Sequence, residues 1–134
     1  MEIYLSTEYL DIYVDRELSF LYQQWKKSVS TEQFRKGFTK MLEIIRKNNL
    51  VSVIAEPEKL GAISNENQKW LDEIWLKQVF DVDIKDLLVI YPKCVLSRLS
   101  TKIWVNNTFK LGINIAYVED IKKSIEFIKK QKIG

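Results

Sequence analysis

The chain has 134 residues, of which 46% are hydrophobic and 29% charged, and its formal net charge is +3. This length and composition predict one globular domain with a single core rather than a disordered chain. The absence of histidine and the presence of only one cysteine and four glycines exclude imidazole-based catalysis, an internal disulfide, cysteine-rich metal sites and a glycine-rich phosphate loop.

The first 25 residues have the pattern of short strands. The second strand alternates apolar and more polar side chains, as a half-buried strand does, and the polar residues 15–17 predict the turn that follows it. We expect these strands at residues 3–5, 9–14 and 20–25.

Helices and strands alternate along the rest of the chain. Ser30 and Gln33 form a capping box, so a helix is expected from Ser30 to the Asn48-Asn49 pair. Pro57 and Pro92 each end an apolar run, because proline cannot donate a hydrogen bond to a sheet. The other expected elements are strands at 50–55, 86–91 and 114–118, and helices at 64–80, at 95–105 and from 121 onward.

Each expected helix carries apolar residues at helical spacing. They are Phe34, Phe38, Met41, Leu42 and Ile45 in the first helix, Trp70, Leu71, Ile74 and Trp75 in the second, Leu96, Leu99 and Ile103 on one side of the third, and Ile121, Ile125 and Ile128 in the last, whose lysines lie away from this stripe. The spacing of Trp70 and Trp75 leaves two interpretations open, because on an ideal helix they point about 140° apart. Either both pack at the edges of the core, or one lines a cleft, a partner surface or a membrane interface.

The order of elements, β-β-β-α-β-α-β-α-β-α, predicts the fold class. It indicates an α/β domain over residues 1–134, with a mixed, mostly parallel sheet, antiparallel strands at its N-terminal side and helices packed on it.

Compartment and partners are predicted from charge and hydropathy. The N-terminus lacks the pattern of a signal peptide and the longest apolar run, 87–91, is too short to span a membrane, so we expect a cytoplasmic protein. Residues 1–92 have 12 basic and 15 acidic side chains, whereas residues 93–134 have 9 basic and 3 acidic ones, a net charge of +6. This basic half is either a solvated face or a contact for an anionic membrane surface. Nucleic acid is not expected, because few aromatic side chains interleave with the lysines.

Reactive groups give little support for catalysis. Glu56 and Glu58 are the nearest approach to a paired-carboxylate site, but a loop-surface role is favoured over a buried pair. Cys94 beside Lys93 has no histidine base and no second cysteine, which favours a structural or incidental thiol. The acidic residues 81–86 lack the glycine and glutamate that an EF-hand loop requires. No catalytic residue, cofactor or metal ligand is therefore expected.

The segment 56–64 is the most informative loop. It leaves the carboxyl end of a buried strand, where ligands of open α/β sheets bind, and enters a helix whose N-terminus favours anions. Ser64 is either only the helix N-cap or also a phosphorylation site.

The segment 60–75 resembles a small bacterial group of STAS-like proteins, related to anti-sigma-factor antagonists. The resemblance lies in Leu60-Gly61, in Ile63-Ser64 and in a Gln-Lys-Trp run at 68–70 that is followed by Trp75. Further agreement covers nearly the whole chain: Trp25 before the helix start at 29–30, the helix at 96–100 after a proline-ended strand, and residues 117–120 before the last helix.

This resemblance implies a STAS-type fold that has no known enzymatic activity or cofactor and acts by binding proteins, nucleotides or lipids. The group is also similar in architecture to CRAL-TRIO domains, which enclose an apolar ligand. One departure matters: the phosphorylated serine of anti-sigma-factor antagonists directly follows the central strand, where this chain has Glu56-Pro57-Glu58. A phosphorylation switch therefore cannot be transferred to Ser64.

Two hypotheses for function follow. The first is a non-enzymatic regulatory module that binds a protein through the 56–64 loop and the helix after it. The alternative is a binder of an apolar ligand or an anionic membrane surface, using three tryptophans beside the basic C-terminal half. A homodimer is compatible with either hypothesis. The candidate interaction residues are Glu56, Leu60, Gly61, Ser64, Trp70, Trp75 and Trp104.

Overall fold

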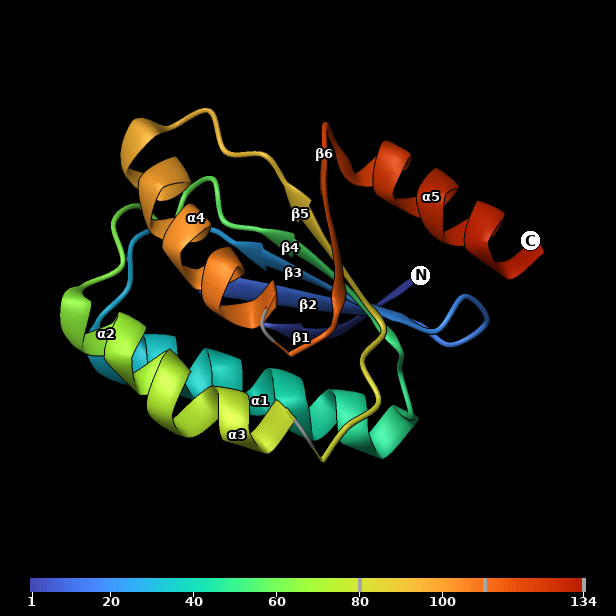
Figure 1. Ribbon diagram of the computed structural model, residues 1–134, viewed down its shortest axis with the longest axis horizontal. Helices are drawn as coiled ribbons and strands as arrows, with labels where there is room; N and C mark the ends of the chain where they lie inside the picture. Colours follow the sequence, from blue (N-terminus) through green and yellow to red (C-terminus); the bar gives the residue numbers. More distant parts are fainter. Residues whose placement is uncertain (80, 110, 134) are drawn as a thin grey trace.

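The chain folds into three layers, with a central sheet between two layers of helices (Figure 1). The computed structural model describes residues 1–79, 81–109 and 111–133. Within them the chain forms a sheet of six strands in the order β1-β2-β3-β4-β5-β6. The strands are β1 (Glu2–Ser6), β2 (Leu10–Asp15), β3 (Phe20–Trp25), β4 (Ser52–Glu56), β5 (Asp86–Ile90) and β6 (Asn114–Val118). The helices are α1 (Thr31–Asn48), α2 (Asn65–Trp70), the π-helical segment η1 (Leu71–Trp75), α3 (Leu76–Val79), α4 (Val95–Phe109) and α5 (Ile121–Ile133).

The sheet is mixed, as the sequence predicts. The strands β1, β2 and β3 pair antiparallel, and β3 to β6 pair parallel, with a helical crossover between successive parallel strands. The α/β class, the order of elements and the antiparallel start are therefore confirmed. Most strand boundaries differ by one or two residues, as at β4, which begins at Ser52, where the Val51 and Ser52 amides both donate to the Ser19 carbonyl. The largest difference is in α4, which continues to Phe109 and not to the expected end at Val105.

Helix α1 follows from its sequence in detail. The Ser30 side chain accepts a hydrogen bond from the Gln33 N–H, the Gln33 side chain accepts from the Ser30 N–H, and the expected capping box is present. Asn49, with φ of 52°, ends the helix in the left-handed conformation that asparagine tolerates. The apolar residues predicted for this helix are all buried, and they face β2, β3 and β4.

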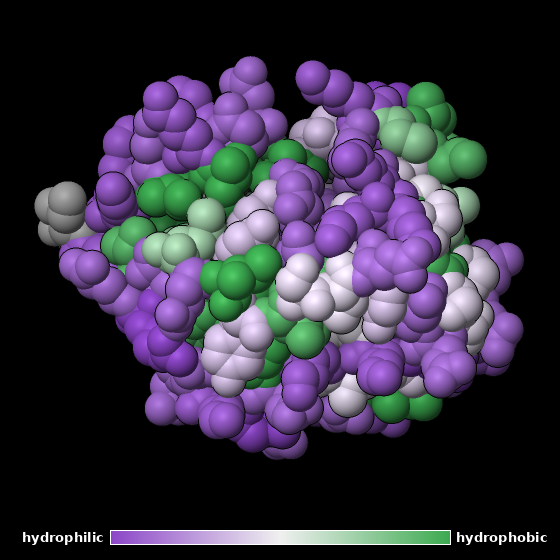
Figure 2. Space-filling model, turned by 180° about the vertical axis from the view of Figure 1, so that it is seen from behind, coloured by the Kyte–Doolittle hydropathy of each residue, from purple (hydrophilic) through white to green (hydrophobic). Residues whose placement is uncertain are grey.

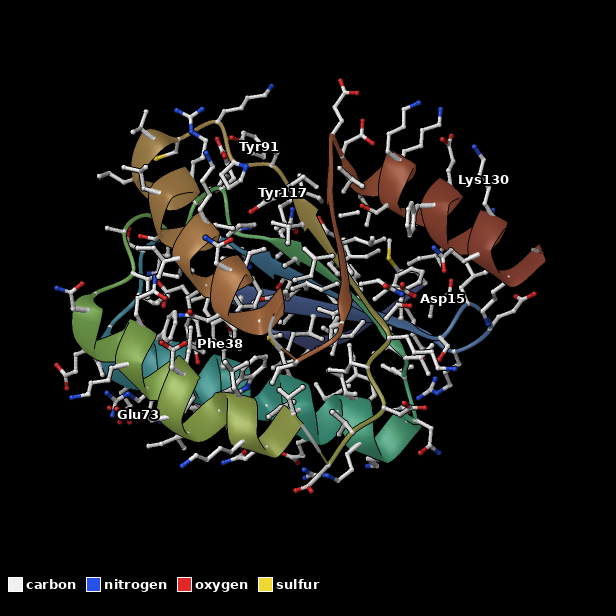
Figure 3. All side chains as sticks on the ribbon, viewed as in Figure 1. Asp15, Phe38, Glu73, Tyr91, Tyr117 and Lys130 are labelled. Atoms are coloured by element: carbon white, nitrogen blue, oxygen red, sulfur yellow. The ribbon has the colours of Figure 1, made fainter. Side chains whose placement is uncertain are left out.

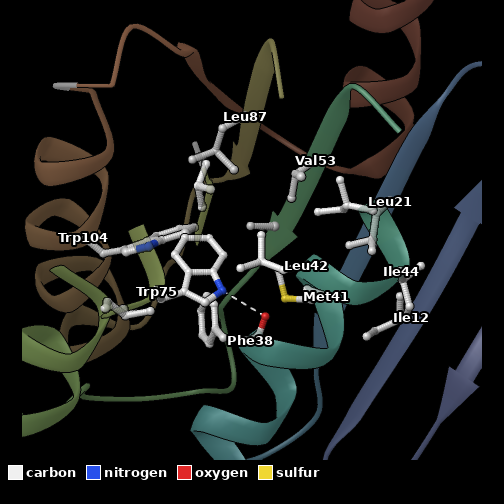
Figure 4. Packing of buried hydrophobic residues seen from close by; sticks show 14 of the residues in the cluster. Ile12, Leu21, Phe38, Met41, Leu42, Ile44, Val53, Trp75, Leu87 and Trp104 are labelled. Atoms are coloured by element: carbon white, nitrogen blue, oxygen red, sulfur yellow. Dashed lines mark hydrogen bonds between the residues drawn. The ribbon is translucent and has the colours of Figure 1, made fainter. Parts of the chain in front are cut away.

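The larger core lies between the sheet and helices α1 to α4 (Figure 4). Trp25 at the end of β3 is 2% exposed and packs on Phe34 and Phe38, with ring centroids 6.1 and 5.6 Å away. Gly37 permits this approach, because a Cβ there would lie 2.7 Å from Trp25 Cη2 and 3.0 Å from Leu10 Cδ2. Aromatic packing thus fixes α1 on the sheet.

The second helical segment differs from the prediction. We expected Ile74 to face the core, but it is 48% exposed, whereas Leu71 and Trp75 are buried. The reason is the π-helical turn, in which the Leu76 N–H donates to the Leu71 carbonyl oxygen. Both tryptophans pack on α1: Trp70 contacts Phe34, and Trp75 contacts Phe38 one turn later.

Helix α5 covers the opposite face of the sheet. Its expected stripe is confirmed, since Ile128 is buried and Ile121 and Ile125 are half-buried against the smaller core cluster of β3, β4 and β5. The lysines of α5 point away from this cluster, as Lys130 does in Figure 3. Seen from behind the view of Figure 1, hydrophobic side chains gather in the middle of the surface, beside a hydrophilic region (Figure 2).

Candidate functional site

The 56–64 loop crosses the carboxyl edge of the sheet and is bound to the fold. The Leu60 N–H donates to the Pro57 carbonyl oxygen over 3.0 Å, and Gly61 has a positive φ of 78°, which glycine adopts without strain. Ser64 is the N-cap of α2, as expected, and its hydroxyl accepts a hydrogen bond from the Asn67 N–H. Both ends of the loop are thus held by hydrogen bonds.

Hydroxyl groups of α4 hold the middle of this loop. Ser97 Oγ donates to the Glu58 carbonyl oxygen and accepts from the Gly61 N–H, each over 2.9 Å. One turn later, Ser100 Oγ accepts from the Ile63 N–H over 2.8 Å. These bonds satisfy backbone groups that a loop packed against a helix would otherwise leave unpaired.

Helix α4 therefore turns its polar side inward. Ser97, Ser100, Thr101 and Thr108 are buried beside Trp104 and Val105. The apolar side, where the sequence places Leu96, Leu99 and Ile103, faces solvent. Exposed fractions along this side are 55% for Val95, 59% for Leu96, 56% for Leu99 and 52% for Ile103. We call these four residues the α4 ridge.

Basic side chains lie next to the α4 ridge. Arg98 and Lys102 follow one flank of the helix and Lys93 precedes it, while the sequence has no acidic residue from Lys93 to Val118. On the other flank, the Asn107 side chain donates to both carboxylate oxygens of Asp72, at 2.8 and 2.9 Å. The α4 ridge is thus apolar with one basic flank.

Two tyrosines adjoin the start of α4. The rings of Tyr91 and Tyr117, at the ends of β5 and β6, meet edge to face with centroids 5.2 Å apart, and the Arg98 guanidinium lies 6.0 Å from the Tyr91 ring (Figure 3). Both tyrosines are about two-fifths exposed, at 40% and 42%. Partial burial, and to a lesser extent Tyr91, raise the pKa of Tyr117.

The predicted interaction residues separate into surface and core. Leu60 is 5% exposed and packs in the larger core, so the expectation that it contacts a partner is wrong for this structure. Its burial follows from the bend at Gly61, which turns the loop back over the sheet. Ser64 is exposed and Gly61 partly exposed, and both remain at the surface.

The tryptophans lie mostly inside the fold. Trp75 and Trp104 are 5% and 4% exposed, and the Trp75 indole N–H donates to the Phe38 carbonyl oxygen over 2.9 Å (Figure 4). Trp70 is half-buried, with the Arg35 guanidinium 5.6 Å from its ring. Two of the three indoles are therefore unable to contact a membrane or a partner directly.

Glu56 is bound within the fold. The Tyr22 hydroxyl donates to Glu56 Oε1 over 2.8 Å. Burial first, and then this hydrogen bond, raise the pKa of Tyr22 well above its ordinary value. Glu58 is occupied elsewhere, because its carboxylate accepts hydrogen bonds from the Lys93 and Cys94 amides. The two carboxylates are thus engaged with separate partners.

A cleft of about 650 Å³ opens at the carboxyl edge, between the ends of β3 to β6. Besides Glu56 and Glu58, its lining includes Asp11, Glu119 and Asp120. Asp11 accepts from Ser6 and Lys26, and Asp120 caps α5 by accepting from the Lys123 N–H. Four of the five carboxylates thus stabilise local structure.

The apolar interior contains little free space. One small cavity of about 20 Å³ lies between the sheet and helices α1, α3 and α4, and Trp75, Trp104 and Met41 line it. Pockets for small organic ligands are typically 300–1,000 Å³. This cavity, in the part of the chain that the structure describes, does not enclose a lipid-sized ligand.

The α4 hydroxyls were not among the predicted site residues. A signal was present, because Ser97, Ser100, Thr101, Trp104 and Thr108 recur at helical spacing opposite the leucine stripe. A side of small hydroxyl residues is typical of close packing against backbone, and it identifies the inward side of α4 only when the neighbouring loop is known.

Comparisons with protein-family models, with curated proteins and with solved structures find no significant match to this chain. Among residues 1–79, 81–109 and 111–133, no cluster of three or more potential metal-ligating side chains occurs. No described helix is long and apolar enough to cross a bilayer.

Proposed function

We propose that the protein is a non-enzymatic binding module, of the STAS-like type that its 60–75 segment resembles, and that it acts through the α4 ridge. The supporting observation is the inverted helix: four aliphatic side chains of α4 are more than half exposed while its hydroxyl groups are buried. A large apolar patch on a protein surface is typical of an interaction site.

Energetics favour a contact at this surface. Full burial of a valine- or leucine-sized side chain stabilises by roughly 1.5–3 kcal/mol, so covering the exposed half of each ridge residue is worth about 1 kcal/mol. The helix is already fixed by Ser97 and Ser100, which means that little conformational entropy is lost on binding. The ridge is therefore preorganised for a partner.

The absence of catalytic chemistry is part of the proposal. The sequence supplies no imidazole base, and the cleft carboxylates of Glu58 and Asp120 are occupied by backbone amides. We therefore assign the protein a binding role without a cofactor. A cytoplasmic location is part of the same proposal.

A photo-crosslinking amino acid at position 99 tests this function, with position 129 on the outer side of α5 as control. Irradiation in cells should give an adduct to protein or to lipid from position 99, none from position 129, and a strongly reduced adduct when Leu96 and Ile103 are both replaced by serine. Equal crosslinking from the two positions, or none from either, would contradict the proposal.

A further inference from the structure

We propose that the partner of the α4 ridge is an anionic lipid bilayer, on which α4 lies in the plane of the membrane; this inference rests on the proposed function. The apolar side is suited to such a contact. At about 100° per residue, Val95, Leu96, Leu99 and Ile103 fall within an arc of about 100° on the outer side of the helix. An amphipathic helix of this kind places its apolar side roughly 5–10 Å into the boundary between headgroups and acyl chains.

The charges match an anionic surface. Arg98 and Lys102 lie along one flank of the α4 ridge and Lys93 lies at its start, and no carboxylate is present between Lys93 and Val118. Long basic side chains can keep their charges at the headgroups while their stems cover apolar surface. Two carboxylates from other elements contact this segment: Glu58 accepts from the Lys93 and Cys94 amides just before α4, and Asp72 accepts from Asn107 near its far end. The α4 ridge between these two contacts is therefore the part that faces the lipid.

The two exposed tyrosines extend the same surface. Tyr91 and Tyr117 lie on the α4 side of the sheet, and Tyr91 contacts the Arg98 guanidinium. Tyrosine is enriched at membrane interfaces because its ring is apolar and its hydroxyl is polar. Tyrosine, arginine, lysine and leucine thus meet at one edge of the molecule.

A second copy of the chain fits this surface less well. A two-fold dimer brings the same patch of both copies together, so the basic flanks would meet without any carboxylate from α4 to neutralise them. A standard protein interface also uses about 20–30 residues on each side, whereas the α4 ridge is a narrow, convex line of four. A fluid bilayer requires no matching groove.

The other basic helix does not join this contact. α5 carries Lys122, Lys123, Lys129, Lys130 and Lys132 on the opposite side of the sheet from α4 (Figure 1). The +6 charge of residues 93–134 is therefore divided between two faces, and the expectation that the whole basic half forms one membrane surface is replaced by α4 alone. The lysines of α5 provide a matched control for charge removal from α4.

Cys94 supplies a native reporter. It is the single cysteine of the sequence, it is exposed, and it immediately precedes Val95. Hydrogen bonding from the Ser97 N–H lowers the pKa of its thiol, which favours labelling by a thiol-reactive dye near neutral pH.

The test uses the full chain labelled at Cys94 with an environment-sensitive fluorophore and titrated with vesicles of phosphatidylcholine, with or without phosphatidylserine. We expect a blue shift only with phosphatidylserine, and its reversal in about 1 M salt, where the screening length falls to roughly 3 Å. Replacing Arg98 and Lys102 by glutamine should weaken vesicle partitioning about 30-fold, from about fivefold per charge. The control Lys129→Gln/Lys130→Gln removes the same charge from α5 and should partition like the parent.

Folding is checked in each variant by its thermal transition, and Leu99→Ser with Ile103→Ser should abolish partitioning without loss of the folded state. No blue shift with phosphatidylserine, or an equal effect of the α5 control, overturns the lipid proposal. A shift that grows with protein concentration and needs no vesicles overturns it in favour of self-association. If vesicles do not bind but position 99 still crosslinks to a protein, the proposed function stands and only the lipid partner is wrong.

Discussion

Helices α1 and α4 are both amphipathic, but they turn opposite sides to the sheet. α1 buries its aromatic and aliphatic residues and leaves charged ones in solvent, whereas α4 buries serines and threonines and exposes valine, leucines and isoleucine. The inward side of each helix matches the surface it packs on. α1 packs on the apolar side chains of the sheet, and α4 packs on the polar backbone of the 56–64 loop.

The difference shows what hydrophobic periodicity can establish. Spacing identifies which residues share a side of a helix, and it does so correctly for both helices. It does not identify which side is inward when the neighbour is a loop with unpaired amides rather than an apolar surface. An apolar helical side left in solvent is therefore informative about binding.

The largest effect is expected in the core beneath α1. Phe38 is 2% exposed and contacts Trp25, Trp75 and Trp104. Phe38→Ala should lower the free energy of unfolding by about 3–5 kcal/mol, because it leaves a cavity in an aromatic cluster. Denaturant unfolding followed by tryptophan fluorescence measures the change. A loss below 1 kcal/mol would mean that α1 is not packed as described.

A smaller loss is expected where α1 approaches the sheet most closely. In Gly37→Ala the new methyl group would lie 2.7 Å from Trp25 Cη2, so the free energy of unfolding should fall by about 1–3 kcal/mol despite the better helix propensity of alanine. Lys36→Ala, at an exposed neighbour, serves as control. Stabilisation by Gly37→Ala would show that the helix sits further from Trp25.

The inward side of α4 should be sensitive to loss of a hydroxyl. Ser100→Ala leaves the Ile63 N–H without its acceptor, and we expect a loss of about 1–3 kcal/mol in chemical denaturation. Thr39→Ala, an exposed hydroxyl on α1, should change stability by less than about 0.5 kcal/mol. Equal effects of the two substitutions would contradict the anchoring role of Ser100.

The outward side of α4 should tolerate polar residues. Leu99→Ser should change the free energy of unfolding by no more than about 0.5 kcal/mol, because Leu99 is 56% exposed. The matched change Leu42→Ser, on the buried side of α1, should cost several times as much. Thermal unfolding of the two variants compares them directly, and similar losses would mean that the α4 ridge is covered in the folded protein.

Much of the fold could be predicted from local chemistry. The Ser30–Gln33 capping box, the proline-ended strands and the isoleucine stripe of α5 all depend on neighbours within one turn or one strand. These features are found where the sequence predicts them, and the α/β class follows from their order.

The candidate site could be predicted only in part, because its features depend on tertiary contacts. Ile74 faces solvent because a π-helical turn shifts the register after Leu71. Leu60 is buried because the Gly61 bend turns the loop inward, and Leu99 is exposed because Ser97 and Ser100 bind that loop. The hydroxyl residues of α4 recur at helical spacing, but this pattern does not say which side of the helix is inward. The STAS-like resemblance, the partner and the cytoplasmic location stay predictions.

The orientation of α4 is the claim on which the account depends, and methyl NMR with a soluble paramagnetic agent measures it residue by residue. The methyl signals of Leu96, Leu99 and Ile103 should broaden strongly, while those of the buried Leu42 and Leu71 remain sharp. If the Leu99 methyl groups are as protected as those of Leu42, α4 faces the other way and the α4 ridge is not a surface.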